Sequence, residues 1–145
     1  MGQRRRAREC ALQMLFQMDL AGGPPEDVFG LFWAGQEAPE ELRAFAEALV
    51  RGVARERLFL DNVVAGSAEH WRIERMAVVD RNVLRMAVYE MLFDAEIPPV
   101  VAIDEAIEVA RKFGSEESGA FINGILDAVR KRVERGEISP RKDGR

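Results

Sequence analysis

Hydrophobic side chains recur every three or four residues along most of this chain, a spacing typical of amphipathic α-helices. The clearest stripe lies near the N-terminus, in a helix that is expected to end at Gly22-Gly23. It consists of Ala7, Cys10, Ala11, Met14, Leu15 and Met18. No segment shows the sustained alternation of apolar and polar residues that a half-buried strand requires. The pattern therefore predicts an all-α fold with the N-terminal helix in its core.

Further helices follow in the first half of the chain. Prolines are accepted in the first turn of a helix, so Pro24-Pro25 predicts a short helix over residues 26–33. From residue 40 the helical spacing of apolar residues continues, but its phase slips across residues 54–57. We therefore expect two successive helices there, followed by a less regular stretch over residues 66–75.

Three more helices are predicted in the second half. A long one has Asp80 near its start and stops before Ile97-Pro98-Pro99, because the residue before a proline avoids the helical region. Another runs over residues 101–113 and ends on Gly114 as its C-cap. The last begins with Ser115 as N-cap and an acidic first turn. The prediction is about seven helices in one domain, residues 1–135, with a polar, disordered tail over residues 136–145.

Charge is unevenly distributed along the chain. The 145 residues contain 21 Lys and Arg against 25 Asp and Glu, a net charge of -4. Without Arg4, Arg5, Arg6 and Arg8 the balance is 17 − 25 = −8, so a local basic patch sits on an acidic body. This asymmetry favours a specific anionic partner over general binding of polyanions. A single cysteine excludes an internal disulfide and suits the cytoplasm, and no apolar run could span a membrane.

Enzyme chemistry has little support in the sequence. One histidine and one cysteine exclude a Cys/His metal cluster, and no phosphate-binding glycine loop is present. The many carboxylates fall on helix faces where acids normally meet water. We therefore expect a binding protein without catalysis, cofactor or metal. A small hydrolase with paired carboxylates is the weakest alternative, because these acids lack a recognisable base or metal partner.

The four N-terminal arginines allow more than one interpretation. An organellar transit peptide is disfavoured because Glu9 and Asp19 interrupt the helix. Guanidinium groups bind phosphate well, since they are planar, charged at neutral pH and rich in donors. Cations at a helix start oppose the macrodipole, so a purely structural role is unfavourable by a few tenths of a kcal/mol. An RNA or other anionic partner is favoured, and an ordinary solvated helix start remains the alternative.

The same helix is apolar on a second side. Leu12, Phe16 and Leu20 lie opposite the core stripe, on the side of Arg5. Such a helix is either sandwiched within the fold or offers one side to a partner.

A second basic and aromatic group occurs near the C-terminus. Arg111, Lys112 and Phe113 precede a loop, and Phe121 and Asn123 follow it. A cation, a ring and an amide are the groups that bind single-stranded RNA. By itself the signal is weak, because Phe121 also fits the core stripe of the last helix and Lys112 suits a helix C-terminus.

Three segments together resemble the NusB family of transcription antitermination factors: RRRARECALQMLF at 4–16, DRNVLRMAVYEM at 80–91 and VAIDEAIEVARKFGSEESGAFINGILDAV at 101–129. The resemblance implies two small helical bundles with the N-terminal helix shared or packed between them. It also implies binding to boxA RNA of nascent ribosomal RNA transcripts, as a heterodimer with the ribosomal protein NusE, in a complex that lets RNA polymerase read through terminators.

The resemblance also implies roles for individual residues. RNA-binding residues would be Arg4, Arg5, Arg6, Arg8, Lys112, Phe113, Phe121 and Asn123. Positions near the protein partner would be Phe16, Asp80 and Glu117. One departure stands out: family members often have a basic residue just before the phenylalanine of the FINGIL motif, where this chain has Gly119-Ala120.

Two alternatives remain beside this hypothesis. The runner-up is a helical protein–protein adaptor without RNA binding, which docks a partner on Leu12, Phe16 and Leu20. Self-association into a homodimer would also use a helix that is apolar on two sides.

Overall fold

The computed structural model describes residues 2–69 and 72–141. Within these residues it contains seven α-helices, one short 3₁₀ helix and no strand, which confirms the all-α prediction. The elements are α1 (Gly2–Ala21), α2 (Glu26–Ala34), α3 (Glu40–Arg55), α4 (Arg57–Ser67), η1 (Ile73–Arg75), α5 (Val78–Phe93), α6 (Pro99–Phe113) and α7 (Ser118–Glu134).

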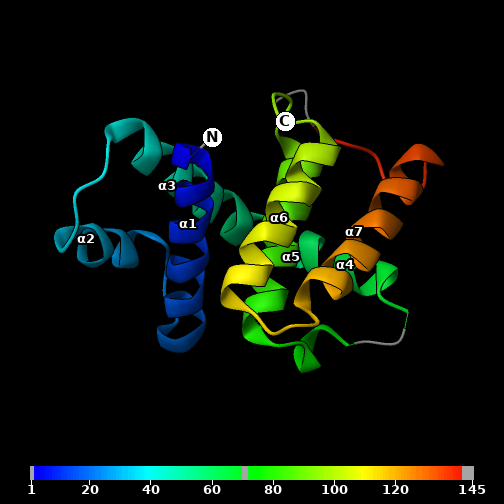
Figure 1. Cartoon of the computed structure of the whole chain (residues 1–145), viewed down its shortest axis with the longest axis horizontal. Coiled ribbons are helices and arrows are strands. Elements are labelled where there is room, and N and C mark those ends of the chain that lie inside the picture. The colour runs from blue at the N-terminus through cyan, green and yellow to red at the C-terminus, as the bar shows by residue number, and fades with distance from the viewer. Residues whose placement is uncertain (1, 70–71, 142–145) are drawn as a thin grey trace.

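The helices form two groups (Figure 1). α1, α2 and α3 make up the first, in which α1 packs chiefly on α3. α4, α5, α6 and α7 make up the second, in which α6 packs on both α5 and α7. α5 also contacts α1 and α3, and α1 contacts α6, so these contacts join the two bundles. The N-terminal helix thus belongs to the first bundle and faces the second.

Local sequence signals account for most helix ends. α1 ends before Gly22, whose φ of 75° is a left-handed conformation that glycine adopts without strain. Only Glu56 separates α3 from α4, at the predicted phase slip. α6 begins two residues earlier than expected, because Pro99 occupies its first turn, where a missing N–H costs nothing.

The start of α7 differs from the prediction. The helix begins at Ser118, after Glu117 in the N-cap position, so Ser115 is not its N-cap. Instead the backbone N–H of Ser115 donates to Ser118 Oγ at 2.9 Å, which closes the loop between α6 and α7. Gly114 is the C-cap of α6 as predicted, with an extended φ of −102°.

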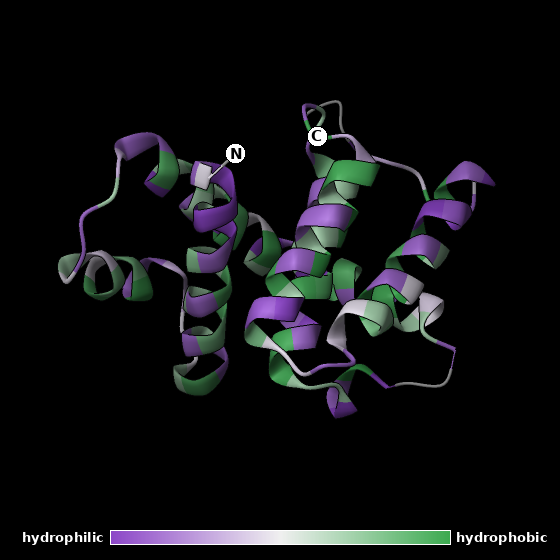
Figure 2. Cartoon of the chain, in the orientation of Figure 1, coloured by the Kyte–Doolittle hydropathy of each residue, from purple (hydrophilic) through white to green (hydrophobic). Residues whose placement is uncertain are grey.

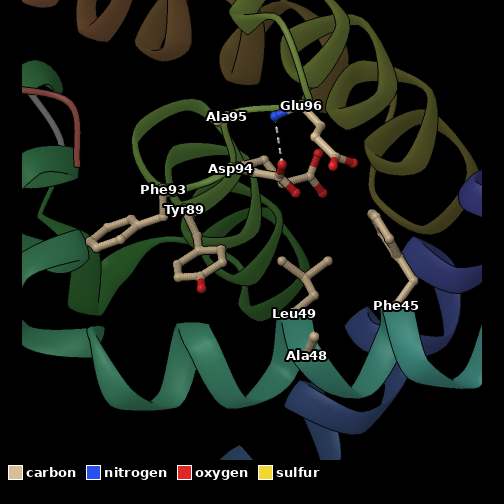
Figure 3. A pocket seen from close by; sticks show the side chains of 9 residues that line it. Phe45, Ala48, Leu49, Tyr89, Phe93, Asp94, Ala95 and Glu96 are labelled. Atoms are coloured by element: carbon tan, nitrogen blue, oxygen red, sulfur yellow. Dashed lines mark hydrogen bonds between the residues drawn. The ribbon is translucent and has the colours of Figure 1, made fainter. Parts of the chain in front are cut away.

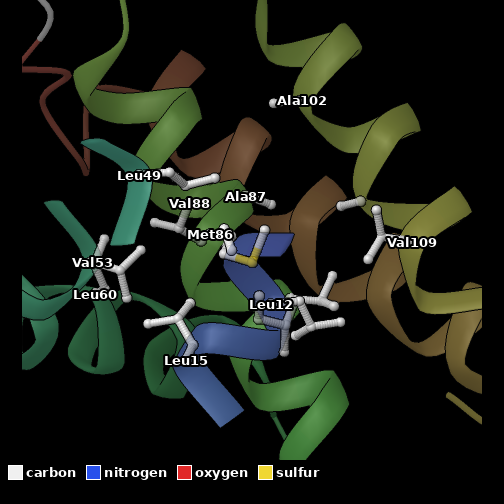
Figure 4. Close-up of a cluster of buried hydrophobic side chains, with 14 of the residues drawn as sticks. Leu12, Leu15, Leu49, Val53, Leu60, Met86, Ala87, Val88, Ala102 and Val109 are labelled. Carbon is white, nitrogen blue, oxygen red and sulfur yellow. The ribbon is translucent and has the colours of Figure 1, made fainter. Parts of the chain in front are cut away.

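One continuous hydrophobic core runs through both bundles (Figure 4). The predicted stripe of α1 belongs to it, and Ala7, Ala11 and Met14 are fully buried. Along the chain, hydrophilic residues occupy the first turns of α1 and the end of α7 (Figure 2). No helix in the described part of the chain has the length and apolar character needed to cross a bilayer.

The C-terminal segment also differs in part from the expectation of a disordered tail. Residues 136–141 return toward α5, and Ile138 is only 7% exposed. The Arg141 backbone N–H donates to the Leu92 carbonyl, and its guanidinium lies 4.1 Å from the centre of the Phe59 ring. One apolar side chain and two contacts anchor a segment whose composition is polar. Residues 142–145 lie outside the described residues.

Candidate nucleic-acid and partner interface

Three of the four predicted arginines lie at the surface of the first two turns of α1. Arg4 is exposed, and its guanidinium stacks over the Phe45 ring at 4.6 Å. Arg6 is exposed and donates to the backbone carbonyl of Glu37 at 2.9 Å. Arg5 is half-buried, and its Nε and Nη2 each donate to a Glu105 oxygen at 2.9 Å. These contacts leave part of each guanidinium open to solvent.

Arg8 is in a different environment, because it is only 5% exposed. Its Nε and Nη2 donate three hydrogen bonds of 2.8–3.1 Å to Glu90 of α5, and Nη1 lies 3.7 Å from Glu105 of α6. A guanidinium that is enclosed in this way is not available to a phosphate. The structure therefore gives Arg8 a role in joining the bundles, in place of the predicted RNA contact.

The two glutamates that bind these arginines differ in acidity. Burial raises the pKa of Glu90 above its ordinary value of 4.5, against the opposing effect of the hydrogen bonds from Arg8. The hydrogen bond from Arg5 lowers the pKa of Glu105 below the same ordinary value. Both carboxylates accept hydrogen bonds from an arginine, but only the Arg5 pair is open to water.

The two predicted RNA regions adjoin along a seam between α1 and α6. Arg5 pairs with Glu105, and one turn further along α1 Glu9 accepts a hydrogen bond from Lys112 Nζ at 3.0 Å. The two helices run side by side in the same direction, so the seam leads from the arginines to the end of α6 (Figure 1). Arg5 and Lys112 therefore pair with Glu105 and Glu9 along the seam, whereas the exposed Arg4 and Arg6, on the same turns of α1, contact Phe45 and Glu37 of the first bundle.

The end of α6 and the start of α7 combine charge with aromatic rings. Lys112 Nζ lies 5.5 Å from the centre of the Phe113 ring. Phe113 and Phe121 are both half-buried and pack against the core, so each ring has a structural role and a solvent-facing edge. Asn123 is exposed on the second turn of α7. Cation, ring and amide therefore lie on neighbouring elements, as the sequence predicted.

Arg111 is the second cation that the sequence places before this loop, although it is not among the expected RNA-binding residues. Its side chain passes over Gly119, where an added Cβ would lie 3.1 Å from Arg111 Nε and 3.4 Å from Cγ. Arg111 stays 64% exposed, with a single 3.3 Å contact to Glu108. It thus brings a cation to the part of α7 where the sequence has Gly119-Ala120 in place of a basic residue. The sequence contains a hint of this contact, because a glycine, Gly119, follows the loop that begins after Arg111.

The second apolar side of α1 divides between core and surface. Leu12 is only 3% exposed, because it lies on the part of α1 that packs against the second bundle. Its proposed place on an exposed docking face was therefore wrong. Phe16 is 41% exposed and Leu20 76% exposed, so both remain available at the end of α1.

The other two predicted partner residues lie at helix starts. Asp80, in the first turn of α5, is 9% exposed, and its buried Oδ1 has no hydrogen-bond partner within the described chain. Glu117 is exposed just before α7, and its carbonyl accepts the Phe121 N–H at 3.0 Å. The last turn of α1 and the loop before α7 lie toward the same end of the molecule (Figure 1).

A buried polar network supports this end of α1. Asn82 donates to Asp19 at 2.9 Å, and Arg85 donates to Asp61 at 2.7 and 3.1 Å and to Asn82 at 3.0 Å. These bonds connect α1, α4 and α5, and the α1 member, Asp19, lies one turn after Phe16. The network orients the last turns of α1, because a satisfied buried polar network allows few alternative arrangements.

Comparison with known proteins identifies the origin of this arrangement. The model of the NusB family matches residues 5–131 of the chain. The chain belongs to the NusB family. A NusB-family relative, transcription antitermination protein NusB of Desulforapulum autotrophicum, is 45% identical over 141 residues, which are 94% of this chain and 99% of the relative.

Solved NusB structures share the fold. NusB of T. maritima superimposes with a TM-score of 0.81 at 36% identity, covering 93% of this chain and 97% of the other. A chain in the crystal structure of the antitermination factors NusB and NusE in complex with dsRNA also has a TM-score of 0.81, at 27% identity, covering 90% of this chain and 98% of that one. The resemblance seen in the three sequence segments is thus confirmed over nearly the whole fold.

Proposed function

We propose that this NusB-family protein is a transcription antitermination factor. It binds boxA RNA of nascent ribosomal RNA transcripts together with the ribosomal protein NusE, and it supports read-through by RNA polymerase. The observation that carries the proposal is the likeness of 90% of this chain to a chain in the crystal structure of NusB and NusE in complex with dsRNA, at a TM-score of 0.81. A site of action in the cytoplasm follows from this function.

The seam between α1 and α6, together with the exposed first turns of α1, is the proposed RNA surface. Arg4, Arg5, Arg6 and Lys112 contact phosphates, since their cationic groups reach solvent on adjoining elements. Phe113, Phe121 and Asn123 contact unstacked bases by stacking and hydrogen bonding. Arg111 joins this group because it lies over the start of α7. Arg8 acts indirectly, by holding α1 against α5 through Glu90.

The charge of this surface supports weak binding to RNA by the isolated chain. Glu105 and Glu9 already neutralise Arg5 and Lys112, and RNA must replace those contacts. The body around the surface is acidic, since the whole chain has a net charge of -4. A second protein that adds its own RNA contacts beside the seam raises the affinity of the composite surface without strengthening nonspecific binding.

The partner surface lies at the other end of α1. Phe16 and Leu20 offer apolar area, and aromatic anchors of this kind contribute most to protein interfaces. The unsatisfied Oδ1 of Asp80 supports a polar contact from the partner, because a buried acceptor without a donor is costly. Glu117 adds an exposed carboxylate before α7.

The proposal is tested by titrating a boxA-like RNA and a scrambled RNA of equal length into the chain, with and without NusE, at physiological salt. We expect preference for boxA and a marked gain in affinity with NusE. The double variant Arg4→Ala/Arg6→Ala should weaken binding, whereas Arg75→Ala, an exposed arginine on η1, should not. Equal binding of both RNAs contradicts the proposal. NusE binding with no RNA affinity would favour the adaptor, and concentration-dependent self-association alone would favour the homodimer.

A further inference from the structure

An aromatic groove lies between α3 and the C-terminal end of α5 (Figure 3). Its volume is about 310 Å³. Phe45, Ala48 and Leu49 of α3 form one wall, and Tyr89 and Phe93 of α5 form the other. Asp94, Ala95 and Glu96, in the link to α6, close its upper edge in this view. None of these residues belongs to the proposed RNA or NusE surface.

The α5 wall of the groove is aromatic and closely packed against α3. The Tyr89 and Phe93 rings stack with centroids 4.8 Å apart and an interplanar angle of 10°. Tyr89 lies directly against α3 because Gly52 has no side chain; an added Cβ there would be 2.2 Å from Tyr89 Cζ. The face of such a ring carries partial negative charge and attracts cations. Phe45 shows this chemistry already, with the Arg4 guanidinium 4.6 Å from its centre.

The edge of the groove adds two formal negative charges. Figure 3 shows the carboxylates of Asp94 and Glu96 close together above the rings. Asp94 Oδ1 accepts the backbone N–H of Glu96 at 2.9 Å, which fixes the turn. Neither carboxylate forms an ion pair within residues 2–69 and 72–141. Glu90, the third acid of the lining, differs because both its oxygens accept hydrogen bonds from Arg8.

The cation that contacts Tyr89 is already engaged. Arg55 donates to the Tyr89 hydroxyl at 3.2 Å and to Glu56 at 3.2 Å, so it is held at the hydroxyl end of Tyr89. The carboxylates of Asp94 and Glu96, which have no ion-pair partner among the described residues, and the parts of Tyr89 and Phe93 that line the groove therefore remain for an external group. An acidic edge repels the phosphates of RNA, so charge complementarity selects a positively charged protein segment.

We propose that this groove docks a basic segment of a protein partner by enclosing one arginine or lysine side chain. The cationic head lies between the aromatic faces and the carboxylates of Asp94 and Glu96, and its aliphatic stem packs along Ala48 and Leu49. This contact is separate from RNA binding and from the end of α1. It gives a transcription complex a second point of attachment to this chain.

The test is an NMR titration of the full-length, ¹⁵N-labelled chain with the tripeptide acetyl-Gly-Arg-Gly-amide. The control peptide has citrulline in place of arginine, which keeps the shape and removes the charge. We expect shifts of the amides of residues 45–49 and 89–96 with the arginine peptide and at least tenfold weaker binding of the citrulline peptide. The Asp94→Asn/Glu96→Gln variant should lose most of the affinity for arginine.

A matched variant separates the groove from general acidity. Asp104→Asn/Glu116→Gln removes the same charge from two exposed acids elsewhere and should leave the peptide affinity unchanged. Equal losses in both variants, equal binding of citrulline, or shifts outside the groove would each overturn the proposal. Asp94→Asn/Glu96→Gln should also bind boxA-like RNA like the parent chain. That readout keeps failure of the groove distinct from failure of the proposed RNA function.

Discussion

Arg5 and Arg8 lie one helical turn apart on α1, and each donates to a glutamate of the second bundle, yet the two pairs serve different ends. The Arg5 side chain is 43% exposed and the Arg8 side chain 6% exposed. A buried pair loses hydration from both charges, so removing one partner leaves an isolated charge in the core. An exposed pair can exchange its partner for another anion at little cost. Burial, more than residue type, thus gives the arginines of this cluster two roles: Arg8 joins the two bundles, and Arg5 belongs to the proposed binding surface.

The largest expected effect comes from breaking the buried pair alone. Arg8→Ala leaves the Glu90 carboxylate without its donors and should lower the free energy of unfolding by about 3–5 kcal/mol. Arg5→Ala, its matched control, should lower it by less than about 1 kcal/mol. Urea denaturation followed by circular dichroism measures both. Similar decreases for the two variants would remove the distinction between them.

Removing the exposed arginines should affect RNA binding and leave the fold intact. Arg4→Ala/Arg5→Ala/Arg6→Ala should make the plot of log affinity for single-stranded RNA against log salt shallower by up to about 2 units, at roughly 0.7 for each phosphate that the variant no longer binds. Fluorescence anisotropy at several salt concentrations measures this slope. Arg75→Ala is the control and should keep the parental slope. An unchanged slope in the triple variant would argue for the adaptor.

Phe16 tests whether the far end of α1 binds the protein partner. Phe16→Ala should weaken NusE binding by about 1–2 kcal/mol, or roughly five- to thirtyfold, because it removes an exposed aromatic anchor. RNA binding by the chain alone should not change. Calorimetric titration with NusE gives the affinity, and Leu31→Ala, which removes a side chain that is 81% exposed on α2, serves as the control. Equal effects of both variants would place the partner elsewhere.

Glu105→Gln tests whether the exposed pair restrains Arg5. Removal of the carboxylate frees the guanidinium for phosphate and should raise RNA affinity a few-fold, with a stability change within about 1 kcal/mol. The same anisotropy titration measures the affinity. Glu74→Gln, which removes an exposed carboxylate on η1, is the comparison. A fall in affinity on Glu105→Gln would mean that Arg5 needs its glutamate in order to bind.

The smallest expected effect is the opposite titration of the two glutamates. Carboxyl ¹³C shifts against pH should give Glu90 a pKa above 4.5 and Glu105 a pKa below 4.5. Stability from Glu105 is present above pH 4.5 and is lost as the pH falls through its lowered pKa. For Glu90 the folded state binds its proton more tightly than the unfolded state. Its contribution therefore falls as the pH rises from 4.5 through the raised pKa. Identical pKa values would contradict the difference in burial.

Local periodicity was sufficient for most of the fold. The phase slip at residues 54–57 located the break between α3 and α4, and Ile97-Pro98-Pro99 correctly indicated that the long helix α5 ends before this segment, although α6 begins two residues earlier than expected. The prediction was wrong about which residues of α1 are exposed. The helical wheel places Leu12 beside Arg5 and Phe16, but the sequence of one helix does not indicate which of its sides packs against a second bundle. Leu12 is buried for that reason.

The limits at the candidate site have the same physical origin. Arg8 looks like its neighbours in sequence, and its partner Glu90 is 82 residues away, so no local pattern distinguishes it. Conversely, the sequence was sufficient to propose Lys112, Phe113 and Asn123 as a cation, a ring and an amide for RNA, because this chemistry does not depend on a distant partner. Their approach to the arginines depends on the contact of Glu9 with Lys112, which only the folded chain brings together.

The most direct test compares the salt dependence of boxA-like RNA binding for Arg5→Ala and for Arg8→Met/Glu90→Met. The double variant replaces the buried pair with apolar side chains and so keeps the chain folded. We predict that Arg5→Ala lowers the slope by about 0.7, as expected when one phosphate is no longer bound, and that the folded double variant keeps the parental slope. A folded double variant with a reduced slope and an Arg5→Ala variant with the parental slope would contradict the division of this arginine cluster.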